Sequence, residues 1–173
     1  MVSGHAWHQL ATRPARHVGE NTGMELVPIE QDGTVRLTGI EMPEICGGIV
    51  EATTALYRRI GFSEPWICYL AVEDQAVVGT CGFAATAAEG SAEIAYFTFP
   101  GGEGQGVATR MAAALIALSS RETASVGGRF IAHTLPAEGA STAILKKLGF
   151  EFEGPVQHPE DGEVWRWRRP ALA

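Results

Sequence analysis

The sequence predicts an α/β chain of the α+β type, with a mixed, mostly antiparallel central sheet of about six or seven strands and helices on both faces. The order of the expected elements carries this prediction: strands, a helix, a three-strand meander, a helix, a strand, a helix and two closing strands. A strand, a glycine turn and a helix at 92–111 form its centre. The composition, 46% hydrophobic and 19% charged over 173 residues, is typical of one globular domain.

Two short strands followed by one amphipathic helix are expected at the start of the domain. Short strands are expected at 25–29 and 34–37, on either side of a turn at 31–33. A helix is expected between Pro43 and Gly61, because glycine commonly terminates helices. Its apolar positions follow the helical period and predict a buried stripe formed by Ile45, Ile49, Ala52, Leu56 and Ile60.

A three-strand meander follows this helix. The runs 66–72 and 76–84 are joined by a short turn at 73–75, which is the spacing of a hairpin. The run 94–99 is rich in β-branched and aromatic residues, which favour strands. Pro100 ends this third strand, because proline cannot donate to a sheet ladder.

The C-terminal half is expected to return to the same sheet. Residues 107–118 are helix formers and apolar nearly all round, which predicts a largely buried helix. The strand expected at 129–133 then runs parallel to the preceding strand, since a helix connects the two. A short helix at 140–148 and strands at 150–154 and 164–168 close the chain.

The glycine-rich turn at 101–106 predicts an anion site. The helix that follows it begins with unpaired backbone N–H groups and a positive dipole end, and Gly104 and Gly106 allow a ligand to approach closely. No lysine follows Gly106, as a nucleotide P-loop requires, and the spacing Gly102-x-Gly104-x-Gly106 differs from a dinucleotide fingerprint. A phosphorylated ligand is therefore expected, and a nucleotide-binding oxidoreductase is disfavoured.

The segment from Glu103 to Ala108 resembles the Arg/Gln-x-x-Gly-x-Gly/Ala motif of the GCN5-related N-acetyltransferases, which holds the pyrophosphate of acetyl-CoA. Glu103 stands where the family has Arg or Gln. A second segment, 135–150, looks like a helix of the ribosomal-protein-acetylating branch, through Ser141 and an ending of Lys147, Leu148, Gly149 and Phe150. Glu138 replaces an Asn there. The resemblance covers residues 66–169.

This resemblance implies the fold of the family, in which the sheet splays and admits the pantetheine arm of the cofactor. It implies acetyl-CoA as cosubstrate, no metal, and direct transfer to a primary amine. A backbone N–H near Phe97 would stabilise the oxyanion. The residues implied in cofactor binding are Phe97, Thr98, Phe99, Gly104, Gln105, Gly106, Val107, Ala108, Thr109 and Ser141.

Glu93 is the candidate general base. It stands in a run of Ala, Glu and Ile that is similar to the one carrying the catalytic glutamate in the histone-acetylating branch. The strand period places it on one face with Ala95, Phe97 and Phe99, where aromatic rings would partly desolvate the carboxylate. The alternative is a solvated glutamate at a strand end. His133, at the end of a later strand, is a second candidate base.

Ser141 is the candidate proton donor for the departing thiolate. Many family members use a Tyr on this helix where the sequence has Leu145, and Ser141 lies one turn earlier. The alternative role for Ser141 is to satisfy local backbone donors at the helix N-terminus. Tyr96 is expected in the core. The residues that could border the acceptor pocket are Trp66, Trp165, Trp167, Asp161 and Glu163.

The remaining expectations concern the whole chain. A net charge of −7 disfavours nucleic acid and permits a cationic acceptor, either a small molecule or a protein amine. No apolar run approaches the roughly 18 residues of a membrane span, so no membrane partner is expected. The three cysteines, Cys46, Cys68 and Cys81, fit neither a zinc site nor a disulfide framework, which indicates a cytoplasmic protein.

Residues 1–23 are expected to form a flexible N-terminal extension, followed by a single acetyltransferase domain at 24–173, as a monomer or homodimer. The alternative function is a catalytically silent acyl-CoA-binding sensor or regulatory module. The departures from the family pattern at Glu103, Glu138 and Leu145 leave this alternative open.

Overall fold

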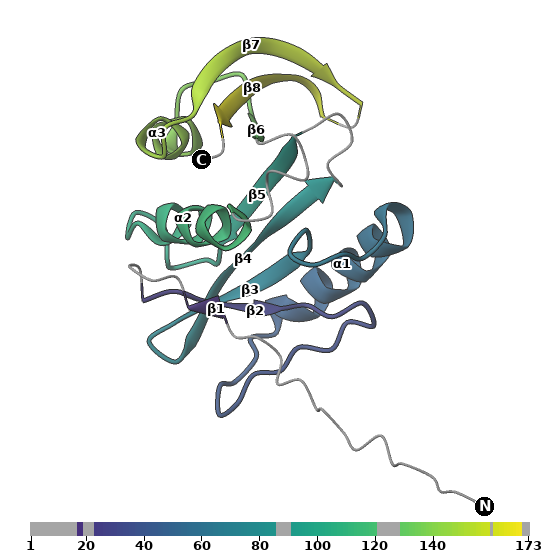
Figure 1. Ribbon diagram of the computed structural model, residues 1–173. Helices are drawn as coiled ribbons and strands as arrows, with labels where there is room; N and C mark the ends of the chain where they lie inside the picture. The colour runs from purple at the N-terminus through teal and green to yellow at the C-terminus, as the bar shows by residue number, and fades with distance from the viewer. Residues whose placement is uncertain (1–16, 19–22, 86–90, 121–128, 160, 171–173) are drawn as a thin grey trace, which may run out of the picture.

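The computed structural model describes residues 17–18, 23–85, 91–120, 129–159 and 161–170, which form one sheet and three helices (Figure 1). The sheet has eight strands in the order β1-β2-β3-β4-β5-β6-β8-β7. The strands are β1 His17–Val18, β2 Glu25–Pro28, β3 Cys68–Glu73, β4 Ala76–Ala85, β5 Ala92–Thr98, β6 Arg129–Thr134, β7 Glu151–His158 and β8 Gly162–Pro170. The helices of the described residues are α1 Ile45–Ile60, α2 Val107–Ser119 and α3 Ala140–Lys147.

The pairing of β5 with β6 divides the sheet into two halves. These two strands are parallel, whereas the other neighbouring strands of the described residues pair antiparallel. The parallel register holds only Ala92 opposite Phe130 and Glu93 opposite Ile131, after which the two strands diverge (Figure 1). The predicted mixed, mostly antiparallel sheet is confirmed, and the two-residue β1 brings it to eight strands.

The two longer helices cover opposite faces of the sheet (Figure 1). Helix α2 is the more buried one, and its Met111, Leu115 and Ile116 pack into the main core with Phe83 and Ile94 of the sheet. Fully burying a side chain of this kind stabilises a fold by about 1.5–3 kcal/mol. This burial fixes the axis of α2, and therefore also the place where its N-terminus meets the end of β5.

The buried face of α1 differs from the predicted stripe. Ile45 is 38% exposed, whereas Tyr57 is buried. The Tyr57 hydroxyl donates to the carbonyl oxygen of Ile29 at 3.0 Å and accepts from the N–H of Cys68 at 2.8 Å, so a polar-tipped side chain turns the helix onto the sheet. The α1 residues that face the core are Cys46, Thr53 and Tyr57.

Two further predictions on strands need correction. The strand expected at 34–37 is reduced to one bridge between Ile29 and Val35, because the tight turn at Gly33, with φ at +88°, carries the chain away after a single pair. Strand β7 runs through Pro155, which the prediction placed beyond the strand end. Proline is tolerated there because β7 is the edge of the sheet and follows a bulge at Gly154.

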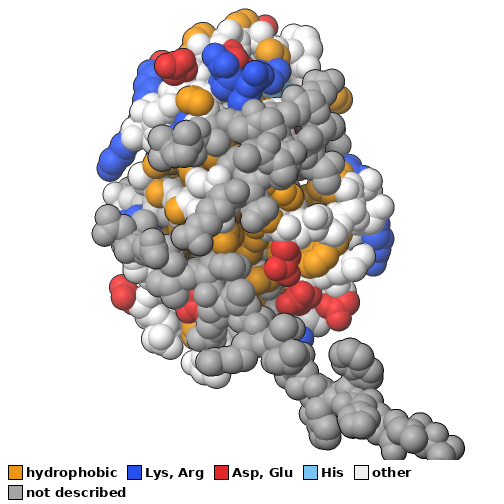
Figure 2. Space-filling model, viewed as in Figure 1, with side chains coloured by type: hydrophobic (Ala, Val, Ile, Leu, Met, Phe, Trp, Pro, Cys, Tyr) orange, Lys and Arg blue, Asp and Glu red, His pale blue; other side chains and the backbone are white. Residues whose placement is uncertain are grey.

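The N-terminal segment is described only in part. His17 and Val18 pair with Leu26 and Glu25 as β1, and the other positions of the predicted extension before residue 23 lie outside the described residues. No helix within the described ranges is long and apolar enough to cross a membrane. Figure 2 shows acidic and basic side chains mixed over one face of the molecule, with Lys and Arg gathered at its top.

Candidate active site

A cleft of about 440 Å³ opens where β5 and β6 diverge, and the glycine turn forms one of its walls. Gly104 and Gly106 have φ angles of +74° and +75°, a conformation that favours glycine. Gly106 is the N-cap of α2, and no side chain caps this helix. Because Val107, Ala108 and the N-cap all line the cleft, the first backbone N–H groups of α2 are placed to bind an anion there.

The cleft includes eight of the residues predicted for the cofactor: Phe97, Thr98, Gly104, Gly106, Val107, Ala108, Thr109 and Ser141. Phe99 does not line it: this side chain is 7% exposed and packs with Val27 and Leu70 in the smaller core cluster. Gln105 does not line it either, because its side-chain amide donates to the Gly101 carbonyl at 3.0 Å and so shapes the turn from within.

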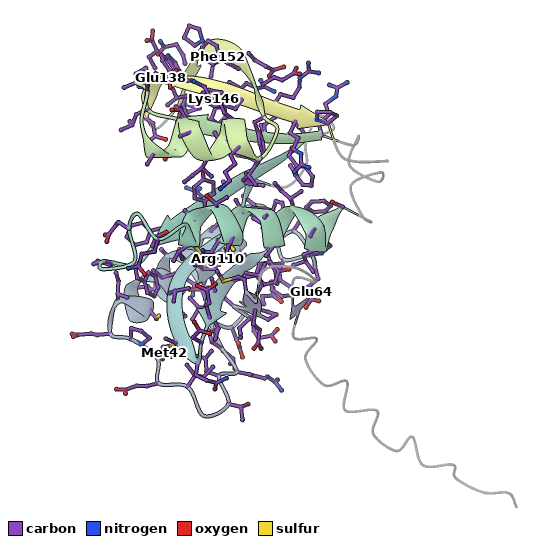
Figure 3. All side chains as sticks on the ribbon, turned by 90° about the vertical axis from the view of Figure 1, so that its left-hand side faces the viewer. Met42, Glu64, Arg110, Glu138, Lys146 and Phe152 are labelled. Atoms are coloured by element: carbon purple, nitrogen blue, oxygen red, sulfur yellow. The ribbon has the colours of Figure 1, made fainter. Side chains whose placement is uncertain are left out.

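Arg110 braces the glycine turn, a role that the sequence analysis missed. Its guanidinium forms a bidentate pair with Glu73, with Nε–Oε1 and Nη2–Oε2 distances of 2.7 Å, and Nη1 donates to the carbonyl oxygen of Gln105 at 2.9 Å. Arg110 lies on the first turn of α2 (Figure 3). The hydrogen bonds that Arg110 donates to the Glu73 carboxylate raise the pKa of Arg110. The β3–β4 hairpin is thereby tied to the turn that shapes the cleft.

Glu103, which departs from the family motif, is used inside the turn. Its Oε2 accepts the backbone N–H of Gly101 at 2.7 Å. The carboxylate thus satisfies a donor of the turn, although the residue also lines the cleft. Like Gln105, it holds the shape of the turn, while the anion site itself consists of backbone N–H groups.

The two candidate bases lie in contact. Glu93 near the start of β5 and His133 near the end of β6 approach to 2.8 Å between Oε1 and Nδ1. Their side chains are 19% and 17% exposed, so the pair is largely shielded from water. The parallel pairing of Glu93 with Ile131 brings the two residues together, although they stand 40 positions apart. The pair lines a polar cavity of about 490 Å³ beside the cleft.

Ser141 lies at the boundary between the polar cavity and the cleft, since it lines both. Its hydroxyl has no hydrogen-bond partner within the described part of the chain. The N-terminus of α3 is instead satisfied by Thr142, whose Oγ1 accepts the Gly139 N–H at 2.9 Å. Leu145 is fully buried in the core. Ser141 therefore has no local capping role in the structure.

Tyr96 and Phe97 lie at the meeting point of three cavities. Tyr96, which is expected in the core, packs against the main core and also lines the cleft, the polar cavity and an apolar cavity of about 330 Å³ between α1 and β4. Burial raises the pKa of Tyr96 to about 12. Phe97 is 51% exposed and lines both the cleft and the apolar cavity. The splayed end of β5 thus connects the three spaces.

The apolar cavity explains part of the α1 stripe. Ile49, Ala52 and Leu56, which were expected to face the core, line this cavity. Their apolar side chains thus face a space that a ligand can enter.

Among the residues expected to border the acceptor pocket, Asp161 lines the polar cavity. The tryptophans and Glu163 line none of the three cavities. Trp167 is 2% exposed and its indole N–H donates to the Thr134 hydroxyl at 3.1 Å, which makes it a core residue. Trp66 packs edge-on against Phe83 at a centroid distance of 4.9 Å.

A model of the family described as acetyltransferase (GNAT) domain matches residues 42–151, which is more than half of the chain. The chain belongs to this GNAT acetyltransferase family. The matched range includes α1, the β3–β5 meander, α2 and α3. No curated protein sequence matches this GNAT chain at a significant level.

Solved structures share the fold of this GNAT chain. The apo structure of RimL, a ribosomal L7/L12 alpha-N-protein acetyltransferase, has a TM-score of 0.67 at 19% identity, with 92% of this chain and 99% of that chain covered. The same protein with coenzyme A has a TM-score of 0.64 at 19% identity, covering 90% and 98%. Aminoglycoside acetyltransferase AAC(6')-Ib with coenzyme A has a TM-score of 0.52 at 18% identity, covering 60% and 65%.

At 18–19% sequence identity, the similarity to these solved structures establishes the fold alone. The match of the family model to residues 42–151 establishes the family. The predicted family and the predicted GNAT fold are both confirmed. This GNAT chain is an acetyl-CoA-dependent N-acetyltransferase. The first backbone N–H groups of α2 are placed to bind an anion such as the phosphates of that cosubstrate.

Proposed function

We propose that the enzyme acetylates the α-amino group of a peptide or protein N-terminus, with Glu93 as general base. The observation that carries this proposal is the 2.8 Å contact between Glu93 Oε1 and His133 Nδ1. It fixes the carboxylate in the polar cavity, which adjoins the cofactor cleft at Tyr96 and Ser141. A base must lie within reach of the proton it removes, directly or through one water.

The proposed reaction is a direct transfer. The acceptor nitrogen attacks the carbonyl carbon of the acetyl thioester, and the carbon–sulfur bond then breaks to release the coenzyme A thiolate. The proton of the amine passes to Glu93, and Ser141 relays a proton from solvent to the thiolate. A backbone N–H near Phe97 is the proposed donor to the oxyanion.

The apolar cavity supports a peptide acceptor. It adjoins the polar cavity at Ala84, Ala95 and Tyr96, so an acceptor with its amine near Glu93 can place an apolar side chain beside Leu56 and Phe97. A peptide N-terminus combines one amine with such a side chain, whereas a polycationic aminoglycoside does not. RimL is described as an α-N-protein acetyltransferase.

Thiol release from acetyl-CoA tests the proposal directly. We expect release with a peptide that has a free N-terminus and apolar residues in its first two positions. We expect little release with a peptide of the same sequence whose N-terminus is blocked and which contains a lysine as its only amine. We also expect little release with an aminoglycoside. No amine-dependent release would favour the silent acyl-CoA sensor, and preferred use of the lysine or the aminoglycoside would contradict the α-amine assignment.

A substitution in the apolar cavity tests the acceptor site. We expect Leu56→Gln to raise the KM of the peptide on the order of tenfold, because burying an unpaired amide beside an apolar group costs about 1–3 kcal/mol. The KM of acetyl-CoA is expected to stay constant. Ala55→Gln is the matched control, since Ala55 is exposed on α1 and lines none of the cavities. Equal effects of the two substitutions would contradict the proposed acceptor site.

We also propose the domain bounds, the localisation and the oligomeric state of the chain. We place the acetyltransferase domain at 24–173, to whose sheet β1 adds one short edge strand, and regard residues 1–23 as an extension that activity does not require, in a cytoplasmic monomer or homodimer that binds neither nucleic acid nor membrane. The net charge of −7 and three free cysteines support this. Removal of residues 1–23 is expected to leave acetyl-CoA binding intact.

A further inference from the structure

Two histidines and one glutamate from three strands meet in the polar cavity. One potential ligand atom each of Glu93, His133 and His158 lies within 4.8 Å of the other two. The rings of the two histidines have a centroid distance of 5.6 Å. The side chain of His158 is 25% exposed, only slightly more than those of the base pair. The three groups are thus half-buried, yet reachable from the cavity.

The curvature of the C-terminal hairpin brings His158 to this place. His158 ends β7, which is separated from β6 by β8 in the sheet, so a flat sheet would keep the two histidines apart. A bulge lies between Phe152 and Gly154, where φ is +130°, and bulges bend strands and increase their twist. Figure 1 shows β7 arching over β8 at the end of the sheet.

We infer that Glu93, His133 and His158 form a binding site for a divalent transition-metal ion of the zinc type, and that the bound ion inhibits acetyl transfer. Two imidazoles and one carboxylate are a ligand set that suits Zn²⁺, Co²⁺ or Ni²⁺, whereas Mg²⁺ and Ca²⁺ prefer oxygen ligands. Zinc–ligand bonds of about 2.0–2.2 Å place tetrahedral ligands about 3.4 Å apart. The farthest pair therefore needs to approach by about 1.4 Å at most.

The surroundings of the three side chains fit a cation. Asp161 Oδ2 lies 3.0 Å from His158 Nδ1, the carboxylate–histidine contact that commonly orients a metal ligand. Besides Glu93 and Asp161, the charged residue of the described chain that lines this cavity is Arg59, so the two carboxylates outweigh it. The cavity volume of about 490 Å³ leaves room for a water molecule as the fourth ligand.

The consequence for the enzyme rests on the proposed function. An ion that coordinates Glu93 and His133 occupies the carboxylate that takes the proton of the amine. The ion also stands where the acceptor enters. A chelator and an excess of acceptor peptide are therefore expected to relieve the inhibition. The concentration of acetyl-CoA is expected to have no effect on it.

Titration of the full-length, reduced protein with Co²⁺ tests the site without reference to activity. We expect one ion per chain, with the visible absorption of tetrahedral cobalt, and His158→Ala to weaken binding more than about 100-fold. Asp161→Asn is expected to weaken it about 10–100-fold, as is typical for partners of metal ligands. The matched control is the triple substitution of His5, His8 and His17 to Ala, which removes the other histidines of the chain and is expected to keep the site.

The three cysteines are poor competitors for the ion, because desolvation raises the pKa of the Cys46, Cys68 and Cys81 thiols and thiolate is the metal ligand. A rise in melting temperature on addition of acetyl-CoA is the control that shows whether each variant is folded. Unchanged cobalt binding by His158→Ala, or its loss in the triple variant, would overturn the inference, as would equal zinc sensitivity of the parent and His158→Ala. A parent that binds cobalt but transfers no acetyl group would instead contradict the proposed function and leave the metal site standing.

Discussion

At the scale of single residues, the main question is how Glu93 is held. Its contact with His133 and the low exposure of both side chains, 19% and 17%, restrict the carboxylate to one position. A solvated glutamate at a strand end would have neither feature. The strand prediction placed Glu93 correctly near the start of β5, and the partner came from a different strand.

Glu93→Gln is expected to lower kcat by about 10²–10⁴-fold, the usual contribution of general-base catalysis, while the affinity for acetyl-CoA stays constant. An α-amine has a pKa of about 7.7–8.0, so much of the acceptor is protonated at neutral pH. The defect is therefore expected to shrink as the pH rises above this value. A variant that keeps its activity within about threefold at pH 7 would show that Glu93 is not the base, and His133 would be tested next.

Ser141→Ala is expected to lower kcat on the order of tenfold. The effect is smaller than that for the base because a thiol with a pKa of about 8.5 leaves readily even without help. Tyr96→Phe is the matched comparison, since Tyr96 borders the same cleft and its raised pKa of about 12 keeps the phenol protonated. Pre-steady-state kinetics at saturating acetyl-CoA and peptide measure the rate of acetyl transfer in both variants. A larger loss in Tyr96→Phe than in Ser141→Ala would move the proton-donor role to Tyr96.

At the scale of elements, the brace between the β3–β4 hairpin and α2 supports the cofactor cleft. Arg110 contacts Glu73 with two hydrogen bonds and Gln105 with a third, so one side chain holds both the hairpin and the glycine turn. The side chains of Arg110 and Glu73 are 33% and 18% exposed. Planar bidentate pairs of this kind restrict geometry as well as add energy.

Arg110→Met and Glu73→Gln are each expected to raise the Kd of acetyl-CoA several-fold, because the turn that presents the backbone N–H groups loses its anchor. The two effects are expected to be non-additive, since residues in contact couple by about 0.5–3 kcal/mol. Calorimetry on the four proteins of this cycle measures the coupling. Glu138→Gln is the control, because it breaks the exposed pair with Lys146, also labelled in Figure 3, and is expected to change little. If the effects of Arg110→Met and Glu73→Gln on the binding free energy of acetyl-CoA simply add, the role of this pair as a brace is contradicted.

At the scale of the whole molecule, the cleft at the glycine turn lies between the two halves of the sheet. The cleft is lined by β5, the glycine turn and α2 on one side and by α3 on the other, so a ligand there contacts both halves. Binding is therefore expected to stabilise the whole fold.

Acetyl-CoA at 100 times its Kd is expected to stabilise the fold by about 2.7 kcal/mol. For a protein of this size this corresponds to a rise in melting temperature of about 5–10 °C. Gly106→Glu is expected to abolish the rise, because φ at Gly106 is +75° and an added Cβ would lie 3.1 Å from Arg110 Nη1, so the turn that presents the backbone N–H groups would be strained and displaced. Differential scanning fluorimetry checks both proteins, with NAD as a control ligand. A rise with NAD, or an equal rise in Gly106→Glu, would refute the assigned anion site.

The sequence by itself determined most of the elements and the glycine turn between β5 and α2. Strand, glycine turn and helix are contiguous at 92–119, and their backbone preferences are local: aromatic residues favour β5, positive φ angles require Gly104 and Gly106, and the following residues favour helix. The same locality explains why α1, α2 and α3 were predicted nearly to their ends.

Only the tertiary structure decided which distant residues meet. The contact of Glu93 with His133 depends on the β5–β6 register, and the position of His158 depends on the bend of β7 at its bulge. The role of the α1 stripe depends on Tyr57, whose hydroxyl turns the helix and leaves apolar side chains to line a cavity. Sheet register, splay and twist sum over many residues, so no single stretch of sequence encodes them.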